Sequence, residues 1–264
     1  MNFSRIALHR LRVLLAVWNA LFLREASARM FGSRAAWVWL VAEPVINILW
    51  LILVFTAIRV RHIGGIETAL WIASGMLVFM TFKRTLTQVQ NAVDSNSALF
   101  AYRQVRPADV ALVRAGCEGF SMLIISFSLF AVGMLMGWMA FPDSAWAVFQ
   151  GFFLAWLCAL GLGLIFGVLV KLIPEMDRII NFIMMPLMMM SGVIFPLNMV
   201  PLPYQAWLMW NPLAHAIEVT RLGFASYYHA TPGLNLNYGY FCGLTLVFFG
   251  IALFRRFNQR LVMQ

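Results

Sequence analysis

The sequence predicts an all-α integral membrane protein with six transmembrane helices, an N-terminal amphipathic helix at the membrane interface and a re-entrant helical hairpin between the fifth and sixth spans. Three observations lead to this class. Of the 264 residues, 62% are apolar and 11% are charged, and the mean hydropathy of +0.83 excludes a soluble domain. Long uncharged segments alternate with short polar ones. One uncharged segment is too long to be a single span.

The predicted spans are six segments with few or no charges: 35–58, 68–82, 119–141, 144–170, 179–195 and 237–254. A hydrocarbon core of about 30 Å needs about 20 helical residues. The 15 residues 68–82 fall short of this length. We therefore expect this helix either to continue past Lys83 or to rely on Glu67 and Lys83, whose long side chains can reach the interface.

Residues 179–217 contain no charged side chain, yet prolines at 196, 201, 203 and 212 interrupt them. As one helix, these 39 residues would extend for about 58 Å, nearly twice the thickness of the hydrocarbon core. We therefore expect a span over 179–195, followed by a re-entrant hairpin over 196–236 that enters one leaflet without crossing. Irregular backbone is tolerated at this depth only where protein or a water-filled cavity surrounds it, which indicates a conduit.

Lysine and arginine are distributed unevenly among the polar segments. Sixteen of the nineteen fall on one side of the predicted topology, and only Arg59, Arg61 and Arg221 fall on the other. By the positive-inside rule both termini are cytoplasmic, as an even number of spans requires. The net charge of +9 is thus mainly a topology signal, and we expect no binding to nucleic acid.

Residues 1–34 are predicted to form an amphipathic helix on the cytoplasmic side of the first span. Arg5, His9, Arg12 and Asn19 recur at helical spacing, and apolar residues occupy the opposite arc. Such a helix lies in the plane of the interface. It is either a simple membrane anchor or a contact for a cytoplasmic partner or an anionic lipid-linked substrate.

The segment 84–109 is the longest polar stretch of the chain. Residues 94–97 offer N-cap side chains for a short helix over 98–105, which places Leu99, Tyr102 and Val105 on one face before Pro107 ends it. This helix either fills a groove on another protein or lies flat on the bilayer as a connector.

Few ionisable residues fall in or near the predicted spans. Glu43 precedes Pro44 in the first span, and it either caps or salt-bridges a neighbouring group or faces the conduit. Arg114 and Glu118 stand about one helical turn apart near the start of the third span, so we expect them to pair with each other.

No catalytic or metal-binding motif occurs in the sequence. The four histidines are scattered, the P-loop pattern is absent, and Cys117, Cys158 and Cys242 show no metal-ligand spacing. We therefore predict neither a catalytic residue nor a metal site. If ATP drives this protein, a separate polypeptide must hydrolyse it.

Aromatic residues gather where the external leaflet is expected: Tyr204, Trp207, Trp210, Phe224, Tyr227, Tyr228, Tyr238 and Tyr240. They form either the interfacial aromatic belt or part of a passage where sugar rings stack on apolar ring faces. Three GxxxG pairs, which begin at Gly133, Gly163 and Gly239, allow helices to approach closely, as a dimer interface needs.

Several strings, in this order along the chain, resemble a known family. They are Arg24-Glu25, residues 31–33 (FGS), residues 42–44 (AEP), residues 99–107 (LFAYRQVRP), residues 190–196 (MSGVIFP) and residues 211–221 (NPLAHAIEVTR). Together they resemble the ABC-2 permeases of polysaccharide export, and among these the inner-membrane permeases of capsular polysaccharide exporters.

The resemblance implies the ABC-2 permease fold in a homodimer, with a channel between the two copies, in the bacterial inner (cytoplasmic) membrane. Two copies of a separate cytoplasmic ATPase would drive it, so that ATP and magnesium bind there and this chain carries no cofactor. The cargo would be an acidic, lipid-linked polysaccharide that is passed to periplasmic and outer-membrane export partners.

The resemblance also implies roles for particular residues. The helix over 98–106 would couple to the ATPase through Leu99, Phe100, Tyr102, Arg103 and Arg106. An anionic lipid phosphate or acidic sugar would enter past Arg24, Arg29, Arg34 and Glu43, unless these arginines serve only as cytoplasmic anchors. The channel or its exit would be lined by Tyr204, Trp207, Trp210, His215, Glu218, Arg221 and Tyr227. Of these, His215, Glu218 and Arg221 would form a polar cluster that shapes the exit.

Two other functions stay open. One is an ABC-2 permease with another cargo, such as O-antigen, teichoic acid or a drug. The other is an integral-membrane transferase that acts on lipid-linked sugars. Substitution of Leu99, Tyr102 or Arg103 is expected to uncouple ATP turnover from export in a transporter and to leave a transferase unaffected.

Overall fold

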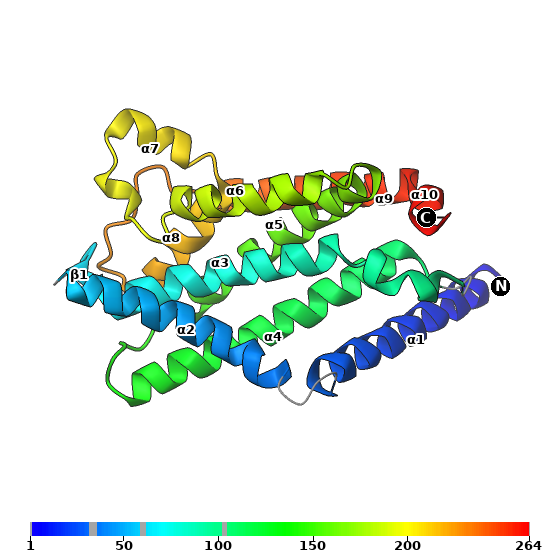
Figure 1. Ribbon diagram of the computed structural model, residues 1–264, viewed down its shortest axis with the longest axis horizontal. Coiled ribbons are helices and arrows are strands. Elements are labelled where there is room, and N and C mark those ends of the chain that lie inside the picture. Colours follow the sequence, from blue (N-terminus) through cyan, green and yellow to red (C-terminus); the bar gives the residue numbers. More distant parts are fainter. Residues whose placement is uncertain (1, 32–35, 59–61, 102–104, 264) are drawn as a thin grey trace.

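The computed structural model describes residues 2–31, 36–58, 62–101 and 105–263. In these ranges the chain is a bundle of helices with two short strands (Figure 1). The elements, in chain order, are α1 (Asn2–Phe31), α2 (Ala36–Ala57), β1 (His62–Ile63), β2 (Ile66–Glu67), α3 (Thr68–Gln90), η1 (Asp94–Ala101), α4 (Pro107–Leu135), α5 (Ala145–Leu172), α6 (Met176–Met190), η2 (Leu197–Met199), α7 (Leu202–Leu208), α8 (Pro212–Phe224), α9 (Leu236–Arg256) and α10 (Asn258–Met263).

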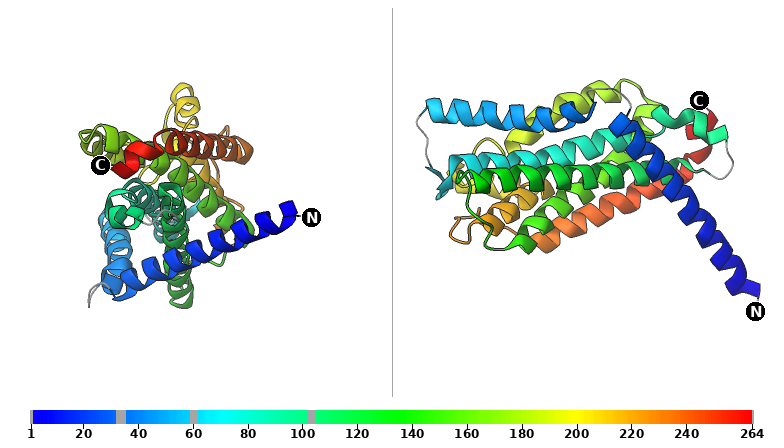
Figure 2. Two further views of the ribbon diagram at one scale, coloured as in Figure 1. Left: turned by 90° about the vertical axis from the view of Figure 1, so that its right-hand side faces the viewer. Right: turned by 90° about the horizontal axis from the view of Figure 1, so that it is seen from below.

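The two chain termini lie at the same end of the bundle, close to the segment that joins α3 to α4 (Figure 1, Figure 2). The strands and α7 lie at the opposite end. We call these the termini end and the hairpin end. This arrangement agrees with a chain that crosses the bundle an even number of times.

The six predicted spans fall on α2, α3, α4, α5, α6 and α9. Among the described residues, α4, α5 and α9 are long and apolar enough to cross a membrane, and α2 holds a shorter apolar stretch over Val41–Phe55. Helix α3 gains length by continuing past Lys83 to Gln90, one of the two solutions expected. Helix α4 begins earlier than predicted because Pro107, which has no N–H to pair, suits a first helical position.

Helix α5 is the centre of the bundle, and α3, α8 and α9 pack closely against it. Glycines permit this approach: a Cβ at Gly163 would lie 2.7 Å from the Val89 side chain, and one at Gly239 would lie 2.6 Å from the Leu154 side chain. The GxxxG pairs 163/167 and 239/243 therefore serve packing within the chain. Their faces are occupied by α3 and α5, so the dimer interface considered from sequence does not use them.

The proline-broken segment folds back into separate helices, as predicted. Helix α6 ends at Met190, and Gly192 takes a positive φ of 77° in the following turn. Helix α8 then begins at Pro212, where the side chain of Asn211 accepts a hydrogen bond of 3.0 Å from the Leu213 N–H. Because α8 packs among α3, α5 and α9, the second half of the segment lies inside the bundle and not on its surface.

A small β-hairpin precedes α3 and was not predicted. Its strands pair antiparallel, with His62 opposite Glu67 and Ile63 opposite Ile66. The two-residue turn of Gly64 and Gly65 has positive φ at both positions, 61° and 92°, which glycine alone adopts without strain in a turn that matches strand twist. The all-α class thus holds for everything except these four residues among those described.

The segment between α3 and α4 differs from its prediction. The helical part is a 3₁₀ helix that begins at Asp94, where 98 was expected, because backbone hydrogen bonds such as Asn96 N–H to Val93 O continue the coil from the end of α3. Asn96 also donates from its side chain to Ala92 O at 2.9 Å. Pro107 begins α4 after an extended Arg106, so it starts the next helix as well as ending the segment.

Helix α1 is continuous from Asn2 to Phe31, as predicted, and extends obliquely past the termini end (Figure 2). It packs on α4 with Leu21 and Glu25, which are both buried. Arg12 of the predicted basic face is exposed. Leu15 and Phe22 of the apolar arc are also exposed, which leaves an apolar strip of α1 free to face lipid.

Candidate functional site

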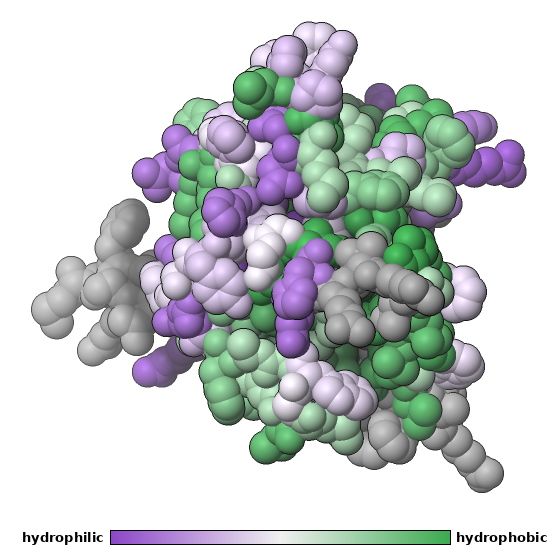
Figure 3. All heavy atoms as spheres, turned by 90° about the vertical axis from the view of Figure 1, so that its left-hand side faces the viewer, coloured by the Kyte–Doolittle hydropathy of each residue, from purple (hydrophilic) through white to green (hydrophobic). Residues whose placement is uncertain are grey.

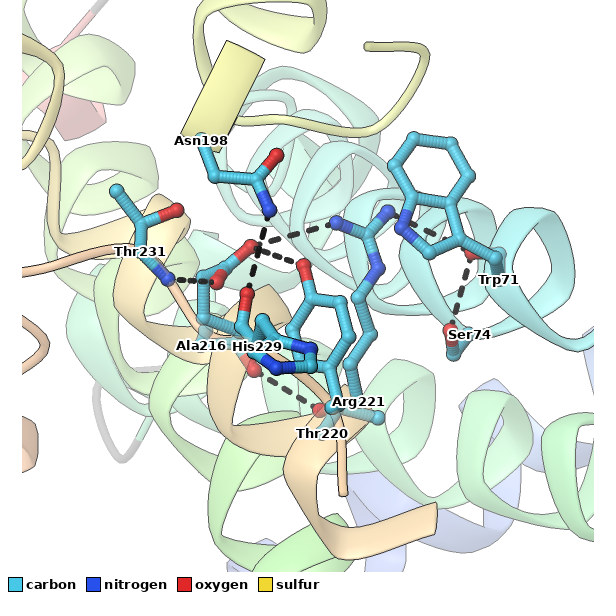
Figure 4. Close-up of polar contacts among 10 residues, drawn as sticks. Trp71, Ser74, Asn198, Ala216, Thr220, Arg221, His229 and Thr231 are labelled. Atoms are coloured by element: carbon cyan, nitrogen blue, oxygen red, sulfur yellow. Dashed lines mark hydrogen bonds and ion pairs between the residues drawn. The ribbon is translucent and has the colours of Figure 1, made fainter. Parts of the chain in front are cut away.

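A buried charged pair lies at the hairpin end, where α8 meets α3 (Figure 4). Arg221 is fully buried, and its guanidinium carbon lies 3.8 Å from the centre of the Trp71 ring, a cation–π contact. Its Nη1 lies 3.5 Å from Glu218 Oε1, and its Nη2 lies 3.5 Å from the Trp71 carbonyl oxygen. Gly75 leaves room for the guanidinium, since a Cβ there would lie 2.6 Å from Nη2.

Glu218 is fully buried and receives hydrogen bonds on both carboxylate oxygens. The Tyr228 hydroxyl donates to Oε1 at 3.0 Å, and the Thr231 N–H donates to Oε2 at 2.8 Å. The Tyr228 ring covers Gly64, where a Cβ would lie 2.6 Å from the ring. A carboxylate in the interior is tolerated only with such compensation. Glu218 therefore ties α8 to the loop before α9, and Tyr228 extends the tie to the β-hairpin.

His215 belongs to a neighbouring set of contacts. Its Nε2 lies 2.8 Å from Met209 O, and its Nδ1 lies 3.1 Å from the Asn235 N–H. Nδ1 accepts the hydrogen bond from the Asn235 N–H and so carries no proton. Nε2 therefore carries the ring proton and donates it to Met209 O, so the ring is in a neutral tautomer. The ring thus joins the corner between α7 and α8 to the start of α9. His215, Glu218 and Arg221 lie on one helix as predicted, and all three are buried within the chain.

The aromatic residues predicted for the exit are exposed: Tyr204, Trp207, Trp210 and Tyr227. Figure 3 looks onto the hairpin end, where hydrophilic and intermediate side chains are mixed, whereas strongly apolar side chains gather toward the flanks. Exposed aromatic rings at a polar end suit both alternatives considered from sequence, an interfacial belt and a surface for sugar rings.

Ion pairs between different helices hold the termini end together. Arg114 of α4 pairs with Glu25 of α1, with 3.1 Å between Nε and Oε1. Arg84 of α3 pairs with Glu118 of α4 at 2.9 Å, and its Nη1 lies 3.8 Å from Glu43 of α2. The predicted pair of Arg114 with Glu118 is therefore wrong, because each side chain meets an opposite charge on a neighbouring helix. Glu43 follows the salt-bridge alternative.

The helix η1 is attached to two neighbouring elements, and the end of α3 just before it is attached to a third. Lys171, near the end of α5, places its Nζ 2.6 Å from Asp94 Oδ1. Arg24 of α1 donates to the side-chain oxygen of Asn96. Just before η1, Gln90 at the end of α3 donates to Asp177 of α6 at 2.8 Å. A displacement of η1 would therefore pull on α1 and α5, and one that reaches Gln90 would also pull on the start of α6.

Among the described residues predicted for coupling and entrance, Leu99 and Phe100 belong to η1 and Arg24 bonds to it. Leu99 and Phe100 are half-buried and pack against the apolar cluster beneath η1. Arg106 is exposed at the N-cap of α4. Arg24 is exposed apart from its bond to Asn96. Outside the described residues lie Arg34, Tyr102, Arg103 and the side chain of Arg29.

The structure adds five residues to those predicted: Trp71, Tyr228, Arg84, Asp94 and Lys171. Each acts through a partner that is distant in sequence, except that Tyr228 lies ten residues from Glu218. The only sequence signal for Arg84 and Lys171 is a basic residue at the end of an apolar segment, which does not identify the partner.

The site has the chemistry of a scaffold and not of a reaction centre. In the part of the chain that the structure describes, no group of three His, Cys, Asp or Glu residues is placed to hold a metal ion. Asp143, in the loop between α4 and α5, accepts a hydrogen bond of 2.7 Å from the Ser226 N–H. This bond lowers the pKa of the Asp143 carboxyl and ties that loop to the end of α8.

A helical bundle of membrane-length helices, with exposed apolar flanks and ion pairs toward both ends, defines an integral membrane protein. The model of the ABC-2 type transporter family matches residues 17–225. This match covers most of the chain, which therefore belongs to the ABC-2 type transporter family. The chain is the transport component and not a catalytic subunit, and membership implies a partner ATPase.

Relatives are similar over most of their length. The polysialic acid transport protein KpsM of Escherichia coli is 32% identical over 241 residues, which cover 90% of this chain and 92% of KpsM. The capsule polysaccharide export inner-membrane protein CtrC of Neisseria meningitidis is 25% identical over 246 residues, with 92% and 91% covered. The capsule polysaccharide export inner-membrane protein BexB of Haemophilus influenzae is 24% identical over 211 residues, with 79% and 78% covered. The resemblance found in the sequence motifs is confirmed.

Proposed function

We propose that this chain is the membrane-spanning subunit of an ATP-driven exporter that moves lipid-anchored capsular polysaccharide from the cytoplasm to the periplasm, through a channel between two copies of the chain. The observation that carries the proposal is the similarity to KpsM along 90% of the chain, within a family match that spans η1, α6 and α8. The proposed location is the bacterial inner membrane, as the names of CtrC and BexB state for those proteins.

In the proposed topology α2, α3, α4, α5, α6 and α9 cross the membrane, and α7 and α8 form the re-entrant pair. The termini end faces the cytoplasm because most of the lysines and arginines belong to it. The hairpin end faces the periplasm. The exposed apolar side chains of α2 and α6, among them Trp39, Trp50, Phe182 and Met185, supply surface for pairing with a second copy.

The partner ATPase would bind at the termini end, around η1 and residues 98–106. The attachments of η1 to α1 and α5, and the bond of the preceding residue Gln90 with α6, support this role, since motion here reaches several helices at once. Arg24, Arg29 and Arg34 would attract the anionic anchor at the entrance, and Glu43, which lies near Arg84, would border it without binding the anchor. Tyr204, Trp207, Trp210 and Tyr227 would guide sugar rings at the exit. ATP and magnesium would bind to the ATPase.

The buried residues His215, Glu218 and Arg221 would act on the exit indirectly. Their hydrogen bonds and ion pair fix α8 against α3, the β-hairpin and the start of α9. We therefore propose that these three residues support the wall of the exit and do not contact the polymer.

Deletion of the gene in its native host tests the proposal. Surface polysaccharide should disappear, and lipid-linked glycan should accumulate inside the cell, because synthesis continues while export stops. The purified chain should also carry an ATP-binding subunit in equal amount. Unchanged surface polysaccharide, or glycosyl transfer by the purified chain without an ATPase, would contradict the proposal.

A further inference from the structure

A pocket of about 470 Å³ opens at the hairpin end, between α7, the loop before α9 and the first turn of α9. Its walls include Gln205, Ala206, Trp210, His215, Asn235 and Tyr238. A volume of this size falls in the range of small-ligand sites. The pocket is separate from the charged pair of Glu218 and Arg221, neither of which lines it.

Two aromatic side chains line the pocket, and a hydrogen bond holds one of them against the backbone of the other residue. Trp210 is 73% exposed and Tyr238 is 37% exposed. The Tyr238 hydroxyl donates to the carbonyl oxygen of Trp210 at 2.9 Å. The two residues come from the α7–α8 corner and from α9, so the bond fixes their relative position. An apolar ligand face can stack on the Tyr238 ring, which is held in this way, without a large ordering cost for that side chain.

The lining of the pocket also includes polar side chains. His215 is neutral and held at both ring nitrogens. Gln205 is only 6% exposed and donates its Nε2 hydrogens to Val200 O at 2.6 Å and Asn198 O at 3.2 Å. Its Oε1 accepts no hydrogen bond from the described residues. A buried acceptor without a donor costs free energy, and a hydroxyl group of a ligand can supply that donor.

The lining excludes some ligand classes. No charged side chain lines the pocket among the described residues, so a phosphate or a lipid headgroup has no cation to bind. A lipid acyl chain would leave the Gln205 oxygen unpaired. A sugar ring fits both features, because it has an apolar face of C–H groups and hydroxyl donors around its edge.

We propose that this pocket binds one or two sugar units of the exported polymer where it leaves the channel, through stacking on Trp210 and Tyr238 and a hydroxyl bond to Gln205. The proposal rests on the proposed export function. It assigns the exposed aromatic rings of the hairpin end unequal roles: Trp210 lines the pocket, whereas Trp207, which is 66% exposed on the same segment, does not.

The test uses the full chain, purified with its ATPase, and oligosaccharides of two to four units prepared from the surface polysaccharide of the host. Binding is followed by saturation-transfer NMR. Trp210→Ala should weaken binding about fivefold, the loss expected for one aromatic stack. Ala206→Leu should weaken it at least as much, because Ala206 is an exposed pocket residue whose enlargement fills the space.

Trp138→Ala, at an exposed tryptophan that does not line the pocket, is the matched control and should bind like the unmodified chain. Thermal unfolding of all three variants checks that each is folded. Equal binding by all variants, or no saturable binding to the unmodified chain, overturns the proposal. Loss of export in Ala206→Leu with unchanged oligosaccharide binding also overturns it, and indicates a protein partner in the pocket instead.

Surface polysaccharide in cells separates this proposal from the export function. If deletion of the gene abolishes surface polysaccharide while Trp210→Ala and Ala206→Leu bind and export normally, the pocket proposal alone fails. If deletion leaves surface polysaccharide unchanged, the export function fails whatever the pocket binds.

Discussion

The two ends of the bundle use charged side chains in different ways. At the hairpin end, Glu218 and Arg221 lie three residues apart on one helix and are both fully buried. At the termini end the partners lie on different elements: Asp94 and Lys171 are 77 residues apart and the Asp94 side chain is 53% exposed, whereas Glu25 and Glu118 are buried. A buried set with dense hydrogen bonds resists rearrangement, whereas partly solvated bonds between elements can break and re-form at low cost.

Helix α3 connects these two regions. Trp71 near its first turn supports Arg221, Arg84 near its last turns pairs with Glu118, and Gln90 at its end bonds to Asp177. We infer that the part of α3 at the hairpin end stays fixed during transport, whereas its part at the termini end moves. The predictions below separate an anchored region from a moving one, and they run from the largest expected effect to the smallest.

Loss of Arg221 should be the most damaging change. Arg221→Ala leaves the fully buried Glu218 without its cation, which should cost about 3–5 kcal/mol of stability. The measure is thermal unfolding of the chain in detergent, together with the yield of folded protein. The double variant Glu218→Gln with Arg221→Met should recover much of the loss. An Arg221→Ala chain that unfolds at the same temperature as the unmodified chain would show that the pair is not an anchor.

Overpacking beneath the termini end should have a smaller effect. Gly163→Val places a Cβ 2.7 Å from Val89 and 3.0 Å from the Leu86 carbonyl, which should cost about 1–3 kcal/mol. Gly116→Ala in α4 is the control, because a Cβ there meets open space. The unfolding temperature should fall for Gly163→Val and stay unchanged for Gly116→Ala. If Gly163→Val instead alters only the oligomeric state, the glycine pair belongs to a dimer interface after all.

Breaking the attachment of η1 should separate stability from transport. Lys171→Ala removes a partly exposed ion pair and should cost less than about 1 kcal/mol. Export should nevertheless fall while ATP hydrolysis continues, since η1 no longer pulls on α5. Exchange of the charges, Asp94→Lys with Lys171→Asp, should restore part of the export. The exposed residue Lys83 supplies a control through Lys83→Ala. Equal loss of export in both lysine variants would argue against a specific attachment.

The smallest effect concerns Asp143 and pH. Its pKa in the folded chain lies below the ordinary 3.8 because the Ser226 N–H donates to the carboxylate. The ionised carboxylate therefore stabilises the fold at pH values above the ordinary pKa of 3.8. This stabilisation is lost as the pH falls through the lowered pKa of the folded chain. Asp143→Asn should remove this acid-side contribution. Thermal unfolding is recorded between pH 3 and pH 6 for the unmodified chain and for Asp143→Asn. The unfolding temperatures of the two chains should approach each other only at the acid end of this range.

The sequence predicted the features that depend on hydropathy and on proline. Prolines 196–212 correctly indicated a break after α6 and separate helices beyond it, and three of the predicted spans fall on α4, α5 and α9, which among the described residues are long and apolar enough to cross a membrane. Pro186, inside α6, shows that a proline in such a segment does not always end a helix. The motif around residues 211–221 correctly placed His215, Glu218 and Arg221 on one helix.

The sequence did not predict which charges meet. Arg114 and Glu118 have the spacing of an ion pair, but Glu25 and Arg84 take their place as partners from α1 and α3. Helical spacing describes one helix alone, whereas these contacts depend on how helices cross. The β-hairpin was missed for another reason: its Gly64-Gly65 turn is a clear signal, but strands of two residues leave no periodic pattern.

Hydrogen–deuterium exchange of the chain with its ATPase, in lipid nanodiscs, tests the central claim most directly. Exchange is compared without nucleotide and after vanadate has trapped the ADP that ATP hydrolysis leaves on the ATPase. We expect amides of η1 and of α1 to change protection, while amides of α8 stay equally protected in both states. The reverse result, with α8 changing and η1 unaffected, would contradict an anchored hairpin end and a moving termini end.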